Sequence, residues 1–568
     1  MSRIDDHLRR RVRAWLAHDP DPETRAELEQ LLANDPDEVA RRFADRIAFG
    51  TAGLRAAMGA GPTLMNELVV RQTTTGLMRW LEPGASVVVG HDARHRSHRF
   101  ARAVVNEVVR CGGRAELIDG PRPTPVLAHA VLDRGADAGV MITASHNPPA
   151  DNGYKLYLAD GIQLVAPADR EIAASIDQVA AAEEADPPAV VAAASAASAS
   201  EAASVHPTVT ILGPEMADRH LDAALAARVA PTTADGPTPR VLYTAMHGVG
   251  GEHVMQAFER AGLPTPAVVP QQFHPDPDFA TVAFPNPEEA GALDLAFAAA
   301  EAESVDLVLA NDPDADRLAA AVRDRDGAWV RLSGDQLGIL LADHLLRHTA
   351  TDAPRMVASS LVSSRLIDAL AAEAGVDSIR TLTGFKWVAR PIVDRPADTY
   401  VFGYEEALGY CVGDRVRDKD GISAAIVAVD AVAELMANGH TVWDHLDAIA
   451  ARHGHYLTRP LSVRLDEGAD DASTFDVGAL LDQLVADSSP MAGVAIDAVD
   501  DLRTGAHLPP TAGVIWDLSD RSRVIVRPSG TEPKIKAYVE VIATDVTDGL
   551  LRLDQLVAAI AERLGARS

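Results

Sequence analysis

The sequence has very little cysteine: Cys111 and Cys411 are the only two among 568 residues. Two thiols cannot build the disulfide framework of a small secreted protein. No apolar run approaches the length of a membrane span. The first residues, MSRIDDHLRRRVRAWLAHDP, contain acids and arginines but no apolar signal core. These absences predict a cytosolic protein.

Lysine is also scarce, because the 52 Lys plus Arg residues include only Lys155, Lys386, Lys419, Lys534 and Lys536. Arginine takes the other basic positions. Lysine differs from arginine in carrying a compact ammonium that can lose its proton. We therefore expect the remaining lysines to mark sites where such a group is needed, with chance retention as the alternative for any one of them.

The formal net charge of −30 argues against nucleic acid or an anionic membrane as the main partner. A small anionic substrate stays possible where local positive charge overrides the overall field. Hydrophobic residues make up 47% and charged residues 24% of the chain, which is typical of a globular protein. At about 100–200 residues per domain, the length predicts three to five domains.

One pattern recurs along the chain after a helical N-terminal extension. A short β-branched strand ends in a Gly, Asp or Ser loop, and a helical stretch is expected to follow. The pattern begins at residues 85–97, 138–148, 239–251, 305–317, 398–410 and 522–534. Alternating strands and helices predict an α/β fold with parallel or mixed sheets. Ligands of such folds bind beyond the carboxyl ends of the strands, where the candidate motifs of this chain lie.

Composition also predicts the domain boundaries. Residues 181–204 are of low complexity, and further boundaries are expected near 327 and 455. The resulting segments are a helical extension (1–48), three α/β domains of similar length (49–205, 206–327, 328–455) and a different fourth domain (456–568).

The segment VMITASHNPPADNGYK, residues 140–155, ends a strand at Ser145. The Pro148-Pro149 pair stiffens the turn that follows. A serine held in this way can act as a nucleophile or a phosphoryl carrier. A simple serine turn at a strand end is the alternative. The G-x-S-x-G pattern of lipase-type serines is absent, which disfavours that triad.

The segment NDPDADR, residues 311–317, places Asp312, Asp314 and Asp316 at alternate positions after a strand. Three such carboxylates can bind one hard cation, Mg²⁺ or Ca²⁺. An EF-hand is excluded because Arg317 and Arg323 stand where it needs glycine and glutamate. A solvated acidic turn is the remaining alternative, and a magnesium loop suits phosphoryl transfer.

Other segments are ambiguous on their own. RPSGTEPKIK (527–536) could bind a phosphate through arginine and turn amides, with a plain Pro-Gly surface turn as the alternative. GYEEALGY (403–410) could bind sugar hydroxyls through carboxylates, although on its own the motif fits solvated acids better. Single residues in further loops, each taken alone, fit a core or surface role better than a site role: Thr51, Arg55, Arg94, His95, His247, Lys386 and Lys419.

Together, TASHNP, DPDADR, GYEEALG and RPSGTEP resemble the α-D-phosphohexomutases, the phosphoglucomutase/phosphomannomutase family, in order and spacing. The resemblance runs from about residue 45 to the end. The start FGTAGLRAAMGAG resembles the long subgroup that includes phosphopentomutases. The family resemblance implies an α/β fold of four domains around a cleft: three related α/β domains with mixed sheets and a C-terminal TATA-binding-protein-like α+β domain.

The resemblance also implies roles. Ser145 is expected to carry a phosphoryl group, with His146, Lys155 and Lys419 near the transferring group. One Mg²⁺ per active site is expected on Ser145, Asp312, Asp314 and Asp316. Substrate binding is expected at Thr51, Arg55, His247, Lys386, Glu405, Arg527, Ser529, Gly530 and Thr531. The expected substrates are sugar phosphates, glucose first and mannose close behind, with a sugar bisphosphate as intermediate and activator, in a monomer or weak dimer.

One position departs from the family pattern: Ala407 stands where many phosphoglucomutases have serine. One hydrogen bond to the sugar is then missing or supplied elsewhere, so the sugar is not fixed by this motif. A phosphopentomutase is therefore a second hypothesis. A sugar-phosphate-binding protein without turnover is disfavoured by the intact serine and aspartates. A metal-dependent phosphatase is disfavoured because a closed cleft would exclude water.

Overall fold

The computed structural model describes residues 5–50, 53–186, 208–232, 236–464, 476–528 and 534–565. The chain forms two compact units. The first contains Met1–Arg331, Ile392–Arg395 and Leu408–Asp430, and the second contains Leu332–Pro391, Pro396–Ala407 and Ala431–Ser568.

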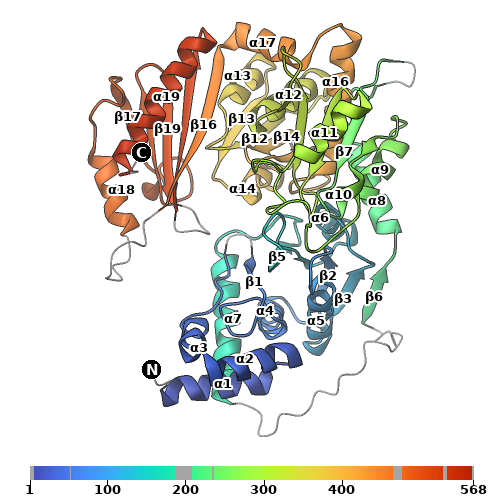
Figure 1. Cartoon of the computed structure of the whole chain (residues 1–568), viewed down its shortest axis with the longest axis vertical. Helices are drawn as coiled ribbons and strands as arrows, with labels where there is room; N and C mark the ends of the chain where they lie inside the picture. The colour runs from blue at the N-terminus through green and yellow to red at the C-terminus, as the bar shows by residue number, and fades with distance from the viewer. Residues whose placement is uncertain are drawn as a thin grey trace. The chain divides into compact units, whose positions relative to one another are not determined.

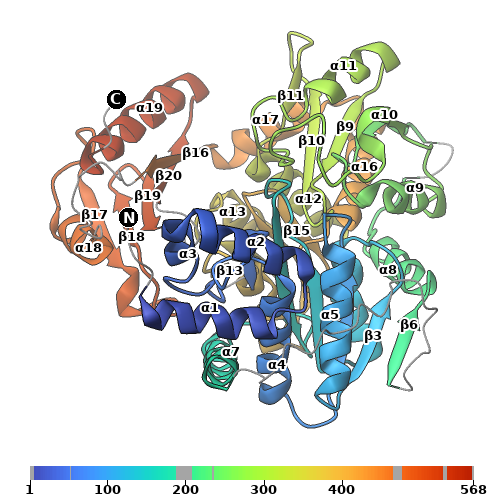
Figure 2. The same ribbon diagram turned by 60° about the horizontal axis from the view of Figure 1, so that its bottom comes forward.

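The N-terminal extension is helical, as the sequence predicts. It forms α1 (Asp6–His18), α2 (Pro22–Asn34) and α3 (Pro36–Arg42). An aspartate caps each helix by accepting a backbone N–H: Asp5, Asp21 and Asp35. The apolar faces of these helices join the first core of the unit, where the Trp15 and Phe43 rings meet edge to face at 5.8 Å. Figure 2 shows α1 to α3 lying together, with α7 (Ala168–Ala185) beside α1.

The first sheet has six strands in the order β1-β5-β4-β2-β3-β6. Their bounds are Leu54–Ala57, Asp151–Leu158, Ala138–Ile142, Ser86–His91, Arg114–Ile118 and Val209–Leu212. The strands β4, β2, β3 and β6 run parallel, whereas β1 and β5 are antiparallel to their neighbours. β2 is buried along its whole length, as expected for a strand covered on both faces.

Helices cover both faces of this sheet. Val87 and Val89 pack in the core with α4 (Glu67–Trp80), α5 (Ser97–Arg110) and α7. Val88 points to the other face and packs with α6 (Thr124–Arg134) and α8 (Glu215–Leu225). The alternation of neighbouring valines between two cores follows from the two-residue period of a strand.

The second sheet of the first unit has the order β11-β10-β9-β7-β8. Its strands are Trp329–Arg331, Leu318–Arg323, Leu307–Asn311, Val241–Thr244 and Ala267–Val268. It is also mixed, since β9, β7 and β8 are parallel while β10 and β11 are antiparallel. Its helices are α9 (Gly250–Arg260), α10 (Pro270–Phe273) and α11 (Asp294–Glu303). The unit further contains β15 (Gly409–Val412) and the first part of α16 (Gly421–Ala437).

The expected helix after each recurring strand is wrong for four of the six segments. Only β2 and β7 are followed by helices, α5 and α9. After β4, β9, β14 (Thr399–Glu405) and β19 (Arg523–Pro528) the next element is a strand. Residues 318–323, LAAAVR, show the physical reason: alanine favours helix, but pairing with β9 and burial in the sheet outweigh that preference. These returning strands make the sheets mixed.

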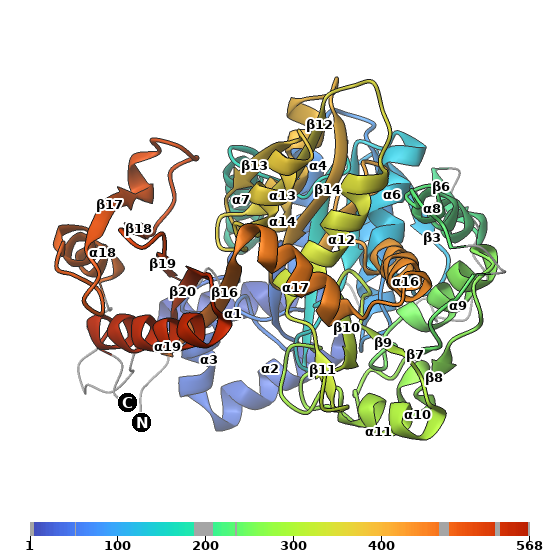
Figure 3. The ribbon, with the colours of Figure 1, turned by 90° about the horizontal axis from the view of Figure 1, so that it is seen from above.

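The second unit contains two sheets. In the first, β12 (Arg355–Ser360) lies between β13 (Asp377–Thr381) and β14, and all three run parallel. Figure 3 shows α12 (Gly334–His348), α13 (Leu366–Glu373) and α14 (Phe385–Ala389) around these strands. The chain also forms α15 (Pro391–Asp394) and α17 (Val442–His453). Capping boxes start α12 at Ser333 and α17 at Thr441.

The C-terminal sheet is antiparallel throughout, in the order β16-β20-β19-β18-β17. Its other strands are β16 (His455–Arg464), β20 (Lys534–Ala543), β18 (Val514–Leu518) and β17 (Ile496–Asp501), and a short 3₁₀ helix spans Leu502–Thr504. One face buries Trp516 and Val539 against α18 (Val477–Ala486) and α19 (Val546–Arg563). Figure 1 shows α19 lying along this sheet. This different fourth domain agrees with the expected fold.

No described helix is by itself long and apolar enough to cross a membrane. α16 and α17 meet that test only as a pair, and they are bent by 86° at the break between them.

Candidate active site

Ser145 lies at the turn between β4 and β5 and is 1% exposed. Its backbone φ is 54°, in the left-handed region that non-glycine residues rarely adopt. The Ser145 N–H donates to Thr143 Oγ1 at 2.8 Å, which closes the turn. The Ser145 hydroxyl donates to Asp312 Oδ2 at 2.8 Å and lies 3.2 Å from His146 Nδ1. The strained turn therefore aims one hydroxyl at the acidic loop.

Arg94 stabilises this turn through side-chain hydrogen bonds. Its guanidinium donates to the carbonyls of Ser145, Asn147, Pro148 and Asp151. The side chain is 1% exposed and pairs with Asp92 at 3.3 Å. Because five fixed N–H donors suit several acceptors at once, arginine can fasten a loop in a way that lysine cannot.

The acidic loop, residues 312–317, connects β9 to β10, and we call it the aspartate loop. Asp312, Asp314 and Asp316 are at most 1% exposed, and their carboxylates lie within 4.8 Å of one another. Ala315 has a φ of 54°, and its N–H donates to the Asp312 carbonyl at 2.9 Å. The tight turn thus directs the alternate carboxylates to one point.

Two lysines neutralise part of this charge. Lys155 of β5 donates to Asp314 Oδ2 at 2.6 Å and to Asp316 Oδ2 at 2.8 Å. Lys419 lies 2.9 Å from Asp316 Oδ2 and 3.7 Å from Asp418 Oδ1. Burial disfavours the Lys419 ammonium, but Asp316 and Asp418 outweigh it and raise its pKa.

The aspartates differ in their electrostatics. Burial, together with Asp314 and Asp316, raises the pKa of Asp312 to about 8. Burial also opposes ionisation of Asp316, but Lys155 and Lys419 hold its pKa below the ordinary value. The pKa of Asp314 is lowered too, because Lys155 outweighs burial and Asp316. The loop therefore holds its negative charge on Asp314 and Asp316, whereas ionisation is disfavoured at Asp312, the carboxyl that faces the serine.

The oxygen atoms of the loop fit a divalent cation. Lys155 and Lys419 occupy the Oδ2 atoms of Asp314 and Asp316, while the Oδ1 atoms of both are buried without a hydrogen-bond partner among the described residues. An unsatisfied buried oxygen is costly, and carboxylate oxygens are the ligands of hard cations. The site can therefore bind a metal ion, as the alternate spacing predicts.

His146, next to Ser145, is also buried. Burial and the nearby Arg317 and Arg55 lower its pKa well below the ordinary value. The ring is therefore neutral at pH 7, with Nδ1 facing the serine hydroxyl.

The other predicted residues of the first unit lie in different surroundings. Arg55 of β1 donates to Asn147 Oδ1 at 3.4 Å, and its Nε is buried without a hydrogen-bond partner among the described residues. His247 follows β7 with a φ of 61°, and its Nε2 lies 2.8 Å from Thr281 Oγ1. The His247 loop packs on the aspartate loop, since Val249 N donates to the Pro313 carbonyl at 2.8 Å.

Three predicted residues belong to the second unit. Glu405 ends β14 and accepts the Gly384 N–H at 2.6 Å. Lys386 in α14 is 5% exposed, with Nζ 5.9 Å from the centre of the Trp387 ring. Arg527 lies in β19 opposite Lys536. Four further predicted residues lie outside the described residues: Thr51, Ser529, Gly530 and Thr531.

Sequence reasoning missed two supporting residues. Asp418 accepts hydrogen bonds from Tyr157 at 2.6 Å and Gln163 at 2.8 Å, and so fixes the segment that carries Lys419. The sequence could have indicated Asp418, because it stands next to Lys419 in RDKDG. Thr124 Oγ1 donates to Asp314 Oδ2 at 2.6 Å. Nothing near Thr124 in the sequence indicates this contact, because 190 residues separate the partners.

Comparison with known proteins places this geometry in a family. Residues 46–183, 218–327 and 333–452 match the alpha/beta/alpha domains I, II and III of phosphoglucomutase/phosphomannomutase, and residues 482–552 match its C-terminal domain. The chain is 38% identical over 493 residues to a probable phosphomannomutase of Haemophilus influenzae, covering 85% of this chain and 94% of the relative. It is 35% identical over 603 residues to a phosphopentomutase of Mus musculus, covering 98% and 95%.

The solved structure of parafusin, a phosphoglucomutase from Paramecium in an open form, superposes with a TM-score of 0.68. It covers 91% of this chain and 94% of that chain at 18% identity, which supports the fold alone. The four domain matches and the two relatives carry the assignment further. The chain belongs to the phosphoglucomutase/phosphomannomutase family and is an enzyme of the phosphomutase type.

Proposed function

We propose that this enzyme interconverts sugar 1-phosphates and sugar 6-phosphates through a phosphoserine at Ser145 and a sugar bisphosphate intermediate. One observation carries the proposal: the Ser145 hydroxyl, on a buried left-handed turn, lies 2.8 Å from Asp312 Oδ2. Phosphoryl transfer depends on positioning and on charge compensation. The turn supplies the positioning, and Lys155 and Lys419 at the neighbouring aspartates supply positive charge.

The proposed transfer needs only residues around that hydroxyl. The bond between phosphorus and Ser145 Oγ breaks, and a bond forms to a hydroxyl oxygen of the sugar monophosphate. The proton of that hydroxyl passes to His146, whose neutral ring can accept it. Lys155 and Lys419 provide positive charge beside the transferring group. After the bisphosphate turns over, its other phosphoryl group returns to Ser145 by the reverse steps.

The proposed cofactor is one Mg²⁺ held by the Ser145 oxygen with Asp312, Asp314 and Asp316. The buried, unpaired oxygens of Asp314 and Asp316 support this choice. When bound, the ion would offset the negative charge of the phosphoryl oxygens.

The remaining predicted residues are proposed to bind substrate. Glu405 would accept hydrogen bonds from sugar hydroxyls, and Arg527 with Ser529, Gly530 and Thr531 would bind the phosphate that does not react. Further contacts are proposed for Thr51, Arg55, His247 and Lys386. The unpaired Nε of Arg55 supports a ligand there. The domain boundaries at 48/49, 205/206, 327/328 and 455/456 are kept as part of this proposal.

Glucose phosphates are the proposed first substrates, with mannose phosphates close behind. The phosphate is expected to dominate binding, because charge-assisted bonds are about twice as strong as neutral ones. The hydroxyl contact that Ala407 cannot make is worth about 0.5–1.5 kcal/mol, so selection between sugars is mild. Pentose phosphates are the second candidate, since the relative that covers 98% of this chain is named a phosphopentomutase.

A panel assay tests this proposal. Glucose, mannose, glucosamine and ribose 1-phosphates are each supplied with Mg²⁺ and a trace of the matching bisphosphate, and product and free phosphate are both measured. The proposal expects 6-phosphate from glucose and mannose, with glucose faster, and slower turnover of ribose 1-phosphate. Faster turnover of ribose 1-phosphate would replace the sugar but keep the mutase. Release of free phosphate as the main product would indicate a phosphatase.

A further inference from the structure

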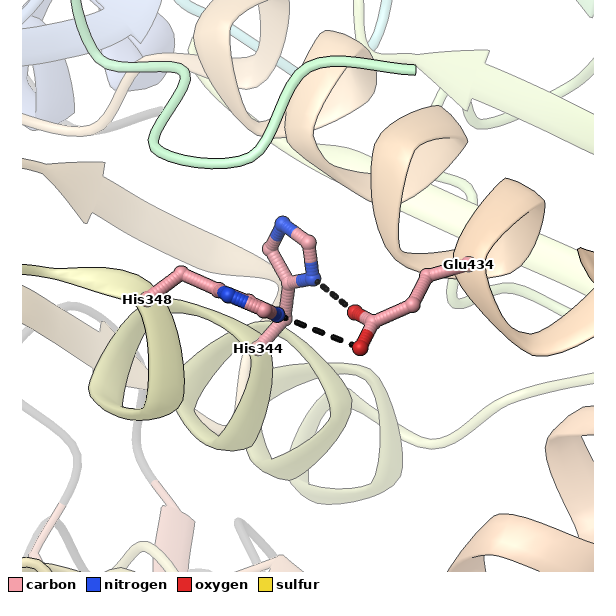
Figure 4. A group of neighbouring side chains, drawn as sticks. All are labelled: His344, His348 and Glu434. Atoms are coloured by element: carbon pink, nitrogen blue, oxygen red, sulfur yellow. Dashed lines mark hydrogen bonds and ion pairs between the residues drawn. The ribbon is translucent and has the colours of Figure 1, made fainter. Parts of the chain in front are cut away.

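A cluster of metal-ligating side chains lies in the second unit, on elements other than the aspartate loop. His344 and His348 stand one turn apart on α12, and Glu434 faces both from α16. His344 Nδ1 lies 2.8 Å from Glu434 Oε2, and His348 Nε2 lies 3.1 Å from Glu434 Oε1. Figure 4 shows the two rings and the carboxylate pointing toward one another. We call these three residues the histidine cluster.

The spacing of the cluster follows from helix geometry. Residues four apart lie on one face of a helix, so both rings of the H-x-x-x-H pair project the same way. The three ligand atoms lie within 4.8 Å of one another. Zinc bonds of 2.0–2.2 Å in a tetrahedron place neighbouring ligand atoms about 3.3 Å apart. The nitrogen–oxygen separations of 2.8 and 3.1 Å therefore need only small adjustments.

The type of ligand selects the metal. Imidazole nitrogen with one carboxylate oxygen suits Zn²⁺, Co²⁺ or Ni²⁺, whereas Mg²⁺ and Ca²⁺ prefer oxygen alone. The cluster thus differs in chemistry from the three carboxylates of the aspartate loop.

The cluster is anchored on one side and accessible on the other. The His344 side chain is 1% exposed, whereas His348 and Glu434 are 33% and 25% exposed. A metal ion can therefore enter from solvent, and water can complete its coordination. His344 fixes the inner ligand position.

Arg347 is the natural competitor of a cation here. It donates to both oxygens of Glu434, and its Nη1 lies 3.2 Å from His348 Nε2. Its Nε also donates to Asp343 Oδ2 at 2.8 Å. Asp343 can hold the guanidinium while Glu434 turns a free lone pair to a metal. A hydrogen-bonded ligand carboxylate is a usual feature of metal sites.

We propose that His344, His348 and Glu434 bind one divalent cation of the zinc class, separate from the ion of the aspartate loop. The bound ion joins α12 to α16. The segment that contains Lys419 and Asp420 leads directly into the start of α16. The ion holds the opposite end of that helix, where Glu434 lies.

Cobalt binding tests the proposal, because Co²⁺ with nitrogen ligands in a four-coordinate site absorbs visible light far more strongly than Co²⁺ with six oxygens. The full-length protein is stripped of metal and titrated with Co²⁺, then with Zn²⁺ as competitor. One equivalent with the strong bands is expected, displaced by Zn²⁺. The signal should persist in Asp314→Asn, which weakens only the aspartate loop.

Two variants each remove one ligand, and a third variant serves as a matched control. His348→Ala and Glu434→Gln change partly exposed side chains and should weaken Co²⁺ binding at least about tenfold. His445→Ala removes an imidazole that bonds Asp343 at 2.9 Å but is no ligand, so its binding should match the wild type. The proposal would be overturned if the strong bands are absent, if they are lost in Asp314→Asn, or if His445→Ala weakens Co²⁺ binding as much as the ligand variants do. The three residues would then form only an ion-pair cluster.

Discussion

The aspartate loop and the histidine cluster both gather metal-ligating side chains, but they are built in different ways. The loop is buried and has a positive φ at Ala315, and the serine turn beside it has a positive φ at Ser145. It also relies on two lysines from distant parts of the chain, Lys155 of β5 and Lys419 of the loop before α16. The cluster lies on regular helices and needs only a four-residue spacing and one facing carboxylate. The side chains of the loop are held in place at the cost of backbone strain, which is typical of catalytic sites. The helical cluster suits binding alone.

The largest difference between the two regions is expected for Ser145→Ala, which changes the serine turn beside the aspartate loop. Removing the hydroxyl that faces Asp312 should lower mutase activity by about 10⁴-fold or more, because no other group on that turn can carry the phosphoryl group. Steady-state assays with glucose 1-phosphate measure the loss. The melting temperature should stay near that of the wild type.

Ser175→Ala is the matched control for this change, since among the described residues its hydroxyl bonds only the Gly76 carbonyl, at 2.8 Å. It should keep full activity. Substantial activity in Ser145→Ala would exclude the serine as carrier.

Within the loop, Asp314→Asn should cut turnover by about 10²-fold or more, a loss of roughly 3 kcal/mol of transition-state stabilisation. The substitution weakens the charge that holds Lys155 and removes a proposed metal ligand. Activity measured against Mg²⁺ concentration should also require more metal.

Asp324→Asn is its control, because within the described part of the chain that carboxylate accepts only backbone N–H groups in an exposed turn. If activity survives removal of divalent ions with EDTA, the aspartate loop is not a metal site.

A smaller effect is expected for Arg94→Lys. Lysine keeps the charge but cannot donate to four carbonyls at once, so the serine turn loosens. We expect kcat to fall about 10–10²-fold with little change in KM, since misplacement costs rate more than binding. Arg99→Lys, which alters ion pairs with Asp21 and Glu67, should leave kcat unchanged. Equal effects of both variants would contradict the assigned role of Arg94.

The smallest effect is expected for the metal-free histidine cluster. Glu434→Gln should lower the free energy of unfolding by less than about 1 kcal/mol, because its ion pairs with Arg347 are partly exposed. Mutase activity should be unaffected. Urea unfolding in the presence of a chelator measures the change, and a loss of several kcal/mol would show that the cluster is already a structural element without metal.

Sequence patterns with a short range predicted the most. The strand before Ser145, the alternate aspartates and the N-terminal helices all follow from local spacing, and the structure places them as expected. Lysine scarcity also proved informative, since Lys155 and Lys419 meet at Asp316. That convergence depends on a strand, β5, and a loop before α16 that lie far apart in the chain, so composition could indicate the two lysines but not their shared contact.

Other features could not be read locally. The Ala-rich strand 318–323 has helical propensity, and only its sheet partners make it a strand. Thr124 supports the site by donating to the Asp314 carboxylate, which only tertiary folding brings near. Arg94 was a candidate from the sequence, but its bonds to the carbonyls of the serine turn could not be predicted from local spacing. The histidine cluster was missed although His344 and His348 have helical spacing, because its third member, Glu434, comes from another helix.

The central claim is that Ser145 carries the phosphoryl group, and direct transfer tests it most closely. The enzyme is incubated with glucose 1,6-bisphosphate, desalted, and mixed with glucose 6-phosphate, and intact mass is recorded before and after mixing. The account predicts one phosphoryl group, mapped by peptide analysis to Ser145, that is lost on mixing while bisphosphate forms. A phosphoryl group on another residue, or one that glucose 6-phosphate does not remove, would contradict it.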